Sequence, residues 1–182
     1  MAYNFEDLYL KVNLISTKLR SDSIVEEYLP GREFSVAILK NRLSNRFNVM
    51  PIELTTTPDK NGISMLSKKV KSSNSENVKE VTDNIIRSNI IELSMKAFNA
   101  LGARDYGRID IRMHDNGIPQ FLEANLIPSL IDRYGSFPKA CMLNISFSYE
   151  NMILNIVELA LNLAIIKEKI SLISHDLILK NY

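Results

Sequence analysis

The stretch RDYGRIDIRMHDNGIPQFLEANLIPSL, residues 104–130, decides the fold that the sequence predicts. Asn116 and Gly117 both tolerate a positive φ angle, which is typical of a two-residue type I′ turn between antiparallel strands. Apolar and polar residues alternate on both sides of this pair, as in strands with one buried face. The sequence therefore predicts a β-hairpin whose turn is closed by Asp115 and Ile118.

The predicted hairpin gathers polar side chains on one of its faces. With this turn, Asp110 lies opposite Glu123, and Arg108 lies opposite Asn125. All four side chains point the same way, because strand residues alternate between the two faces. The other face carries an apolar set suited to a core, namely Ile109, Ile111, Met113, Leu122 and Ala124.

The two facing carboxylates suggest a metal site. At facing strand positions they would lie about 5 Å apart, and they repel each other unless a cation or a proton lies between them. The oxygen atoms of Asp110, Glu123 and Asn125 suit a hard divalent ion. Arg108 would stabilise an anionic group transferred beside the metal. The alternative is an ordinary amphipathic hairpin whose polar face contacts water, with Arg108 and Asp110 compensating each other's charge.

Three stretches resemble D-alanine–D-alanine ligases, a family of the ATP-grasp superfamily. The run RIDIRMHDNGIPQFLEANLIPSL (108–130) is similar to the family's Arg-x-Asp strand, its Glu-x-Asn strand and the following proline. IVEEYLPGREFSVAIL (24–39) resembles the adenine-binding strand and the strand after it. SFPKA (136–140) and ISFSYENMILNIVELAL (145–161) resemble the closing loop and the last helix. Because the matches keep the family's order, the sequence is identified as a member of this family.

The resemblance implies an ATP-dependent carboxylate–amine ligase that acts through an acyl phosphate, with ATP and Mg²⁺ (or Mn²⁺) as cofactors. It implies that Asp110, Glu123 and Asn125 bind the metal ions that bridge the nucleotide phosphates. Arg108 would stabilise the phosphoryl and tetrahedral transition states, since such transfer needs mainly positioning and charge neutralisation. The implied substrate is an amino acid or a dipeptide-forming small molecule, and the implied pathway is peptidoglycan biosynthesis.

The resemblance also assigns nucleotide contacts outside the hairpin. The adenine and ribose contacts would come from Glu26, Tyr28, Leu29 and Glu33. Residues 58–77 are rich in Lys, Ser, Asn and Gly and predict a long loop. By resemblance this loop is a lid that brings Lys68 or Lys69 to the phosphates. The alternative for residues 24–39 is a plain antiparallel hairpin with Glu26 and Glu27 in solvent. The alternative for residues 58–77 is a solvated basic loop that binds no ligand.

Two departures from the family pattern leave the acceptor substrate open. Pro128 and Ser129 stand where the family usually has Pro-Gly. The loop IDRYGSFPKA (131–140) is about one residue longer than usual. Ser136 is therefore the preferred match to the family's substrate-contacting serine, with Gly135 as the adjacent choice.

The sequence as a whole predicts an α/β (α+β) fold, the ATP-grasp C-terminal subdomain, in which helices flank a mostly antiparallel sheet. This subdomain would span residues 1–168, without the family's N-terminal substrate domain and first ATP-grasp subdomain. Residues 169–182 would form an extra tail, either a short helix or a strand. The other predicted elements are helices at 4–20, from an Asn77–Glu80 cap to Gly102 and at about 148–168, and strands at 23–30, 33–40 and about 47–56.

Composition is that of a soluble domain, with 46% hydrophobic and 24% charged residues among 182. A net charge of +1 argues for neither a nucleic-acid partner nor a membrane partner. The lone cysteine, Cys141, excludes an internal disulfide and is expected to be a buried structural thiol in a reducing, cytoplasmic compartment. The apolar run at 152–166 has a polar stripe and is too short to span a bilayer.

Two other functions remain open from the sequence. The absence of the first subdomain favours a truncated or remnant domain that binds nucleotide without turnover. A metal-dependent hydrolase or nuclease would instead use Asp110 and Glu123 and act without ATP. The sequence leaves open whether another chain supplies the missing lysines, and the expected protein partner is a second copy of this chain or a complementing chain.

Overall fold

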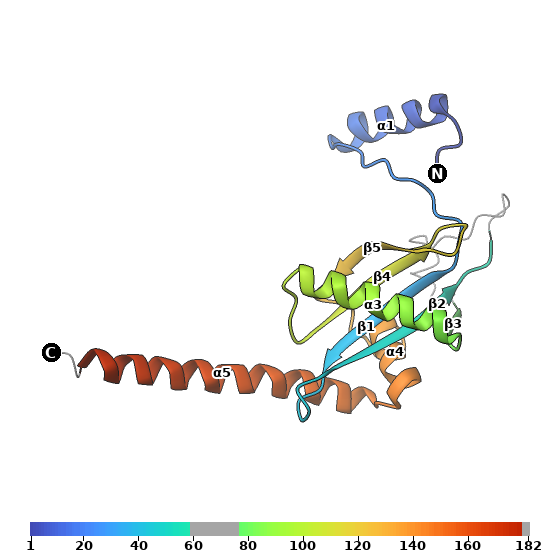
Figure 1. Ribbon diagram of the computed structural model, residues 1–182. Helices are drawn as coiled ribbons and strands as arrows, with labels where there is room; N and C mark the ends of the chain where they lie inside the picture. Colours follow the sequence, from blue (N-terminus) through green and yellow to red (C-terminus); the bar gives the residue numbers. More distant parts are fainter. Residues whose placement is uncertain (59–76, 180–182) are drawn as a thin grey trace.

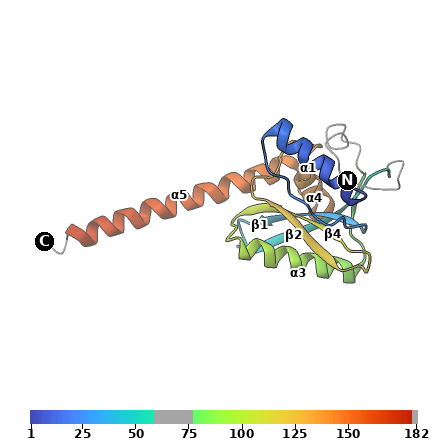
Figure 2. The ribbon, with the colours of Figure 1, turned by 90° about the horizontal axis from the view of Figure 1, so that it is seen from above.

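The computed structural model describes residues 1–58 and 77–179, with side chains up to Ile165. Its centre is an antiparallel sheet of five strands in the order β3-β2-β1-β4-β5 within the described residues. Helices cover both faces of this sheet (Figures 1 and 2). This arrangement confirms the predicted α+β class with flanking helices. The strands are β1 (Glu33–Lys40), β2 (Phe47–Thr55), β3 (Asn77–Glu80), β4 (Tyr106–Met113) and β5 (Pro119–Asn125).

The side chains of β1 point alternately to the two faces of the sheet, which explains why a hydrophobic core lies on each face. One face packs against α3 (Asn84–Ala100), and the other packs against α4 (Ser136–Ile145) and the beginning of α5 (Tyr149–Leu179). Successive strand residues point to opposite faces, so a strand that is apolar throughout can supply both cores. The buried residues on the α3 face include Phe34, Val36, Ile38, Ile90 and Phe98, and those on the α4 face include Ala37, Leu39, Phe137, Ala140 and Met152.

Residues 23–30 do not form a strand, so that prediction is wrong. Ile24 and Val25 are exposed, and residues 23–30 pair with none of the described strands, so these β-branched side chains gain no cross-strand packing there. The chain meets the sheet at Gly31, whose N–H donates to the carbonyl of Met113 at 3.0 Å. A Cβ atom at Gly31 would lie 2.5 Å from that carbonyl oxygen, so glycine is required for this close approach.

Helix α3 begins later than the sequence predicted. Asn77–Glu80 is the edge strand β3, paired antiparallel with β2, so the predicted Asn77–Glu80 cap is wrong. Asp83 is the N-cap, and its carboxylate accepts hydrogen bonds from Ile85 N and Ile86 N, each at 3.0 Å. Aspartate caps a helix as well as asparagine does, and the preceding segment gains backbone partners by joining the sheet.

The turn of the hairpin differs from the predicted type I′ form. His114 N donates to Ile118 O at 2.9 Å, and Gly117 N donates to His114 O at 3.0 Å. Three residues therefore lie between the closing pair, in place of two. Gly117 has a φ of +79°, whereas Asn116 is absent from the residues with positive φ. A three-residue loop with glycine in the left-handed region is the next most common hairpin connection.

A β-bulge restores the predicted pairing at the base of the hairpin. The register shifts between Asp110 and Ile111, so that Ile111 faces Phe121 while Asp110 faces Glu123. Leu122 is the extra residue, because a bulge sets two residues against one. The sequence placed Leu122 in the core, and that prediction is wrong: its side chain is 43% exposed.

The two terminal helices lie at the periphery of the molecule. Helix α1 (Phe5–Leu19) confirms the predicted helix at 4–20, but it lies apart from the sheet and has no buried residue (Figure 1). Helix α5 is continuous from Tyr149 to Leu179, so residues 169–179 extend the predicted last helix and form no separate short element. Within the described ranges, no helix is long and apolar enough to cross a membrane.

Candidate functional site

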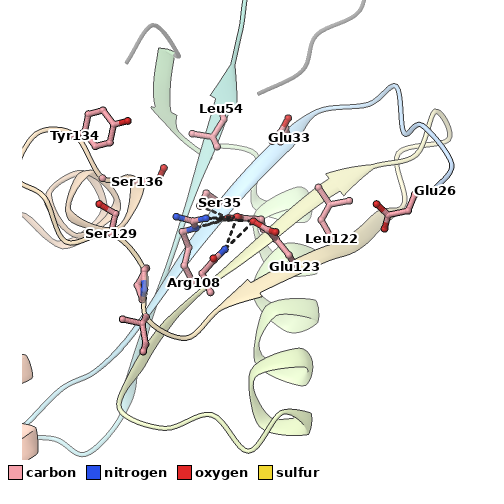
Figure 3. Close-up of a pocket in the computed structure, with 15 residues that line it drawn as sticks. Glu26, Glu33, Ser35, Leu54, Arg108, Leu122, Glu123, Ser129, Tyr134 and Ser136 are labelled. Atoms are coloured by element: carbon pink, nitrogen blue, oxygen red, sulfur yellow. Dashed lines mark hydrogen bonds and ion pairs between the residues drawn. The ribbon is translucent and has the colours of Figure 1, made fainter. Parts of the chain in front are cut away.

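A pocket of about 580 Å³ opens on the α4 face of the sheet. Strand residues form one part of it, and the loop after β5 together with the beginning of α4 forms the other (Figure 3). In the close-up, Ser129, Tyr134 and Ser136 lie on one side of Arg108, and Glu26 and Leu122 lie on the other. The strand residues that line the pocket are Glu33, Ser35, Leu54, Arg108, Asp110, Leu122, Glu123 and Asn125.

Asp110 is the centre of a polar network in this pocket. Its Oδ1 accepts from Ser35 Oγ at 2.7 Å and from Arg108 Nε at 2.9 Å. Its Oδ2 accepts from Arg108 Nη2 at 2.7 Å and from Asn125 Nδ2 at 3.3 Å. Asn125 Nδ2 also donates to Glu123 Oε1 at 3.1 Å. The structure thus brings Arg108, Asp110, Glu123 and Asn125 together, as the hairpin register requires.

Ser35 is a member of this network that sequence reasoning missed. It lies directly opposite Asp110 in the β1–β4 pairing and is almost fully buried. A hydroxyl group within a buried strand needs a hydrogen-bond partner, and the Asp110 carboxylate provides it. The available signal was its place as the one polar residue inside the apolar run FSVAIL, residues 34–39.

The network fits a divalent cation on the chemistry of its donors. Arg108 Nη2 lies 2.7 Å from Asp110 Oδ2 and 3.8 Å from Glu123 Oε1, so one positive charge already serves both carboxylates. The Asn125 amide also points its nitrogen at both, and a half-turn of that amide would present its oxygen instead. Hard oxygen atoms are the ligands that Mg²⁺ and Mn²⁺ prefer. Nowhere in the described residues, this pocket included, do three His, Cys, Asp or Glu side chains converge, so the donor set here is two carboxylates and the Asn125 amide.

The predicted nucleotide residues are only partly brought to the pocket. Glu26 and Glu33 line it, whereas Tyr28 and Leu29 are half-buried nearby and do not. The Tyr28 ring instead stacks on the guanidinium of Arg112, 5.2 Å from the ring centre. Lys68 and Lys69 lie outside the described residues. The ligand roles of all these side chains stay predictions.

Gly135 and Ser136, the two residues that the sequence offered for the substrate-contacting position, lie next to each other at the beginning of α4. Both residues line the pocket, where Gly135 is the N-cap of α4. A Cβ atom on Gly135 would lie 2.5 Å from Ser129 O, so this position cannot carry a side chain without displacing the facing loop. Ser136 brings a hydroxyl group to the pocket, and its contact with a substrate stays a prediction.

Cys141 takes no part in this chemistry. It is fully buried on the α4 face of the sheet, and burial raises the pKa of its thiol to about 12. A thiol with such a pKa stays protonated at neutral pH and is a poor nucleophile. The predicted structural role of this residue agrees with its position.

Comparisons with known proteins identify the family. The family model described as "D-ala D-ala ligase C-terminus" matches residues 3–158. The uncharacterized protein y4sG of Sinorhizobium fredii is 29% identical over 153 residues, which are 82% of this chain and 44% of that protein. A D-alanine–D-alanine ligase of Hydrogenovibrio crunogenus is 28% identical over 143 residues, covering 78% of this chain and 42% of the ligase.

Solved structures share the fold. The D-alanine–D-alanine ligase from Bacillus anthracis complexed with ATP superposes with a TM-score of 0.67 and 19% identity, over 88% of this chain and 48% of that one. The VanG D-Ala:D-Ser ligase from Enterococcus faecalis superposes with a TM-score of 0.65 and 20% identity, over 87% of this chain and 44% of that one. The chain spans half or less of the length of these relatives. Because the family model covers most of its residues, the chain belongs to the D-alanine–D-alanine ligase family through the C-terminal ATP-grasp domain.

Proposed function

We propose that this chain forms the Mg-ATP-binding part of an ATP-dependent carboxylate–amine ligase. The observation that carries the proposal is the convergence of Arg108, Asp110, Glu123 and Asn125 in one pocket of a chain of this family. Peptidoglycan precursors are the proposed context, because D-alanine–D-alanine ligases are among its relatives. The cytoplasm is the proposed compartment.

The proposed reaction has two steps. A carboxylate oxygen of the first substrate attacks the γ-phosphorus of ATP, ADP leaves with the bond electrons, and an acyl phosphate forms. The amine nitrogen of the second substrate then attacks the acyl carbon, phosphate leaves, and the nitrogen loses a proton. The product has a new C–N bond. Both steps concentrate negative charge, so positioning and electrostatic stabilisation are the main catalytic needs.

The strand residues of the pocket would supply both the positioning and the electrostatic stabilisation. Arg108 would lie beside the transferring phosphoryl group, and Ser35 would keep the Asp110 carboxylate oriented. Magnesium or manganese, when bound to Asp110, Glu123 and Asn125, would screen the phosphate charges. Since Asp110 already accepts hydrogen bonds on both oxygens, its geometry is fixed before a ligand arrives.

The charge balance of the pocket supports a requirement for added cations. Among the described lining residues, Arg108 is the one cation against four carboxylates. A nucleotide phosphate chain would be repelled by this set unless metal ions or lysines accompany it. We propose that Lys68 or Lys69 supplies one such charge. The four carboxylates are those of Glu26, Glu33, Asp110 and Glu123.

The two ends of the pocket would receive different parts of the reaction. Glu26, Tyr28 and Leu29 would contact adenine, and Glu33 would contact ribose. At the other end, the hydroxyl groups of Ser129 and Ser136 would contact the amino-acid acceptor. One structural neighbour is a D-Ala:D-Ser ligase, so both D-alanine and D-serine are suitable acceptors for a first assay.

The second candidate function is nucleotide binding without turnover. The observation in its favour is that the chain spans less than half of its curated relatives. A homodimer or a complementing chain is the proposed protein partner. A hydrolase that uses Asp110 and Glu123 differs from both, because it would act without ATP.

Isothermal calorimetry with a non-hydrolysable ATP analogue tests the proposal. We expect binding in the presence of magnesium and none in its absence, since the carboxylates repel unscreened phosphates. A lack of binding in both conditions would contradict the proposed function. Phosphate release from ATP with D-alanine or D-serine then separates a ligase from a binding remnant, and phosphodiester cleavage without ATP would favour the hydrolase.

A further inference from the structure

Arg112 is a buried cation on β4 that the proposed reaction leaves without a role. It is 6% exposed and lies on the same face of the sheet as Arg108 and Asp110, since the three occupy every second position of β4. Burying a guanidinium is costly unless it is paired and hydrogen-bonded. Its partners therefore indicate what it does.

Arg112 joins two segments that form the nucleotide end of the pocket. Its Nη1 lies 2.8 Å from Glu33 Oε2, and Glu33 faces it directly in the β1–β4 pairing. Its Nη2 donates to Tyr28 Oη at 3.3 Å, and its guanidinium stacks on the Tyr28 ring. The attraction between a guanidinium and an aromatic ring stabilises the contact in addition to the hydrogen bond. One side chain thus fixes a pocket carboxylate and anchors residues 23–30, which pair with none of the described strands.

Glu33 is held at the wall of the pocket, where its carboxylate is accessible to a ligand. Its carboxylate lines the pocket and is 16% exposed. Carboxylates placed at nucleotide sites accept hydrogen bonds from ribose hydroxyl groups. A carboxylate that is already immobilised loses less side-chain freedom on binding, so it discriminates more strongly.

We propose that Arg112 is a positioning residue that holds Glu33 toward the ribose hydroxyl groups of a bound nucleotide. This inference rests on the proposed nucleotide site. It predicts that the loss of Arg112 weakens recognition of the sugar and leaves recognition of the phosphates intact. A merely structural residue would weaken both together.

The chain offers a matched control in a second arginine–glutamate pair. Arg32 Nε and Nη2 donate to Glu53 Oε1 and Oε2 at 2.8 and 2.6 Å, and Glu53 is almost fully buried. Neither residue lines the pocket. Replacing Arg32 therefore removes an ion pair next to Glu33 in sequence without removing the partner of Glu33.

The experiment measures the affinities of ATP, 2′,3′-dideoxyATP and tripolyphosphate, each with magnesium, by calorimetry on the full chain. The wild type should prefer ATP over the dideoxy nucleotide by about tenfold, as expected for a hydrogen bond to a charged group. In Arg112→Met the preference should fall below about twofold, while tripolyphosphate affinity stays within about twofold of wild type. Arg112→Lys should retain part of the preference, and Arg32→Met should retain all of it.

Several outcomes would overturn the inference. These are a full preference for ATP in Arg112→Met, an equal loss of preference in Arg32→Met, and a wild type that binds both nucleotides equally. If Arg112→Met does not fold, Arg112→Lys tests the inference. Its preference for ATP over 2′,3′-dideoxyATP should lie between those of the wild type and Glu33→Gln. A wild type that binds no nucleotide would remove the proposed function as well, which distinguishes the two failures.

Discussion

At the scale of single residues, the two acidic side chains of the polar network have different environments. The Asp110 side chain is 14% exposed and accepts hydrogen bonds from Ser35, Arg108 and Asn125. The Glu123 side chain is 57% exposed. Removing the charge of Asp110 would leave buried donors without an acceptor, which is destabilising. Glu123 is therefore the better position for testing metal binding without disturbing the fold.

Glu123→Gln should abolish magnesium-dependent nucleotide binding and leave stability almost unchanged. The substitution removes a charged ligand, but it also relieves repulsion between neighbouring carboxylates. Calorimetry with an ATP analogue and thermal unfolding measure the two effects. Glu92→Gln is the control, because Glu92 is an exposed residue of α3 on the opposite face of the sheet. Unchanged nucleotide affinity in Glu123→Gln would refute the metal assignment.

Glu53 should make stability depend on pH in the acid range. Burial opposes its charge, but hydrogen bonds from Arg32 and Lys79 hold the pKa of its carboxyl group below the ordinary value of 4.5. A depressed pKa means that the stabilisation is fully present above pH 4.5 and is lost as the pH falls through the lower folded-state value.

Urea unfolding of the wild type and of Glu53→Gln at several pH values measures this effect. We expect the wild type to be more stable by about 1.5–3 kcal/mol at pH 7, as for hydrogen bonds to a charged group. The difference should shrink steadily below pH 4.5. A difference that stays constant down to strongly acid pH would show that the Glu53 charge does not stabilise the folded state.

At the scale of elements, the β4–β5 hairpin shows which features of the fold the sequence predicts. The pairing of Asp110 with Glu123 followed from the position of Asn116–Gly117 and from the alternation of side chains, and the structure has this pairing. The turn length did not follow, because Asn-Gly suits both two-residue and three-residue loops. The bulge was missed for the same reason, since it compensates for the longer loop.

Leu122→Ser should cost little stability because the bulge turns this side chain into the pocket. We expect a loss below about 1 kcal/mol, as for most partly exposed positions. Ile111→Ala on the neighbouring strand should cost about 2–5 kcal/mol, since Ile111 is fully buried. Urea unfolding of both variants measures the difference, and a larger loss for Leu122→Ser would restore the core assignment.

Two predicted elements were wrong because strand pairing in the folded sheet overrides the local sequence pattern. Residues 23–30 have β-branched side chains, but they pair with none of the described strands, and strand propensity stabilises a segment only through such pairing. Asn77–Glu80 has the composition of a helix cap, but the edge of β2 is available to it. Ser35 and Arg112 were missed because their roles depend on the β1–β4 register, which joins segments about 75 residues apart in sequence.

At the scale of the whole molecule, the fold class, the site hairpin and the order of the main elements were predictable, whereas the surroundings of α1 were not. An amphipathic pattern shows that a helix has a face to bury, but it does not show what buries it. In the described residues α1 has no fully buried side chain, and Phe5, Tyr9 and Leu10 are all more than half accessible. The chain spans less than half the length of the first curated relatives that it matches, so the activity of a whole ligase is part of the proposal.

The bulge at Leu122 separates the length of the hairpin tip from the alignment of the site. Without compensation, one added residue in the loop would move every residue of β5 to the opposite face and carry Glu123 and Asn125 away from Asp110. With the bulge, the loop is one residue longer, and Asp110 still faces Glu123 while Arg108 still faces Asn125. The hairpin can thus accept an insertion near residues 115–117 during divergence, provided that a second insertion arises before Glu123. Designed variants with a shortened turn would need Leu122 deleted in the same step.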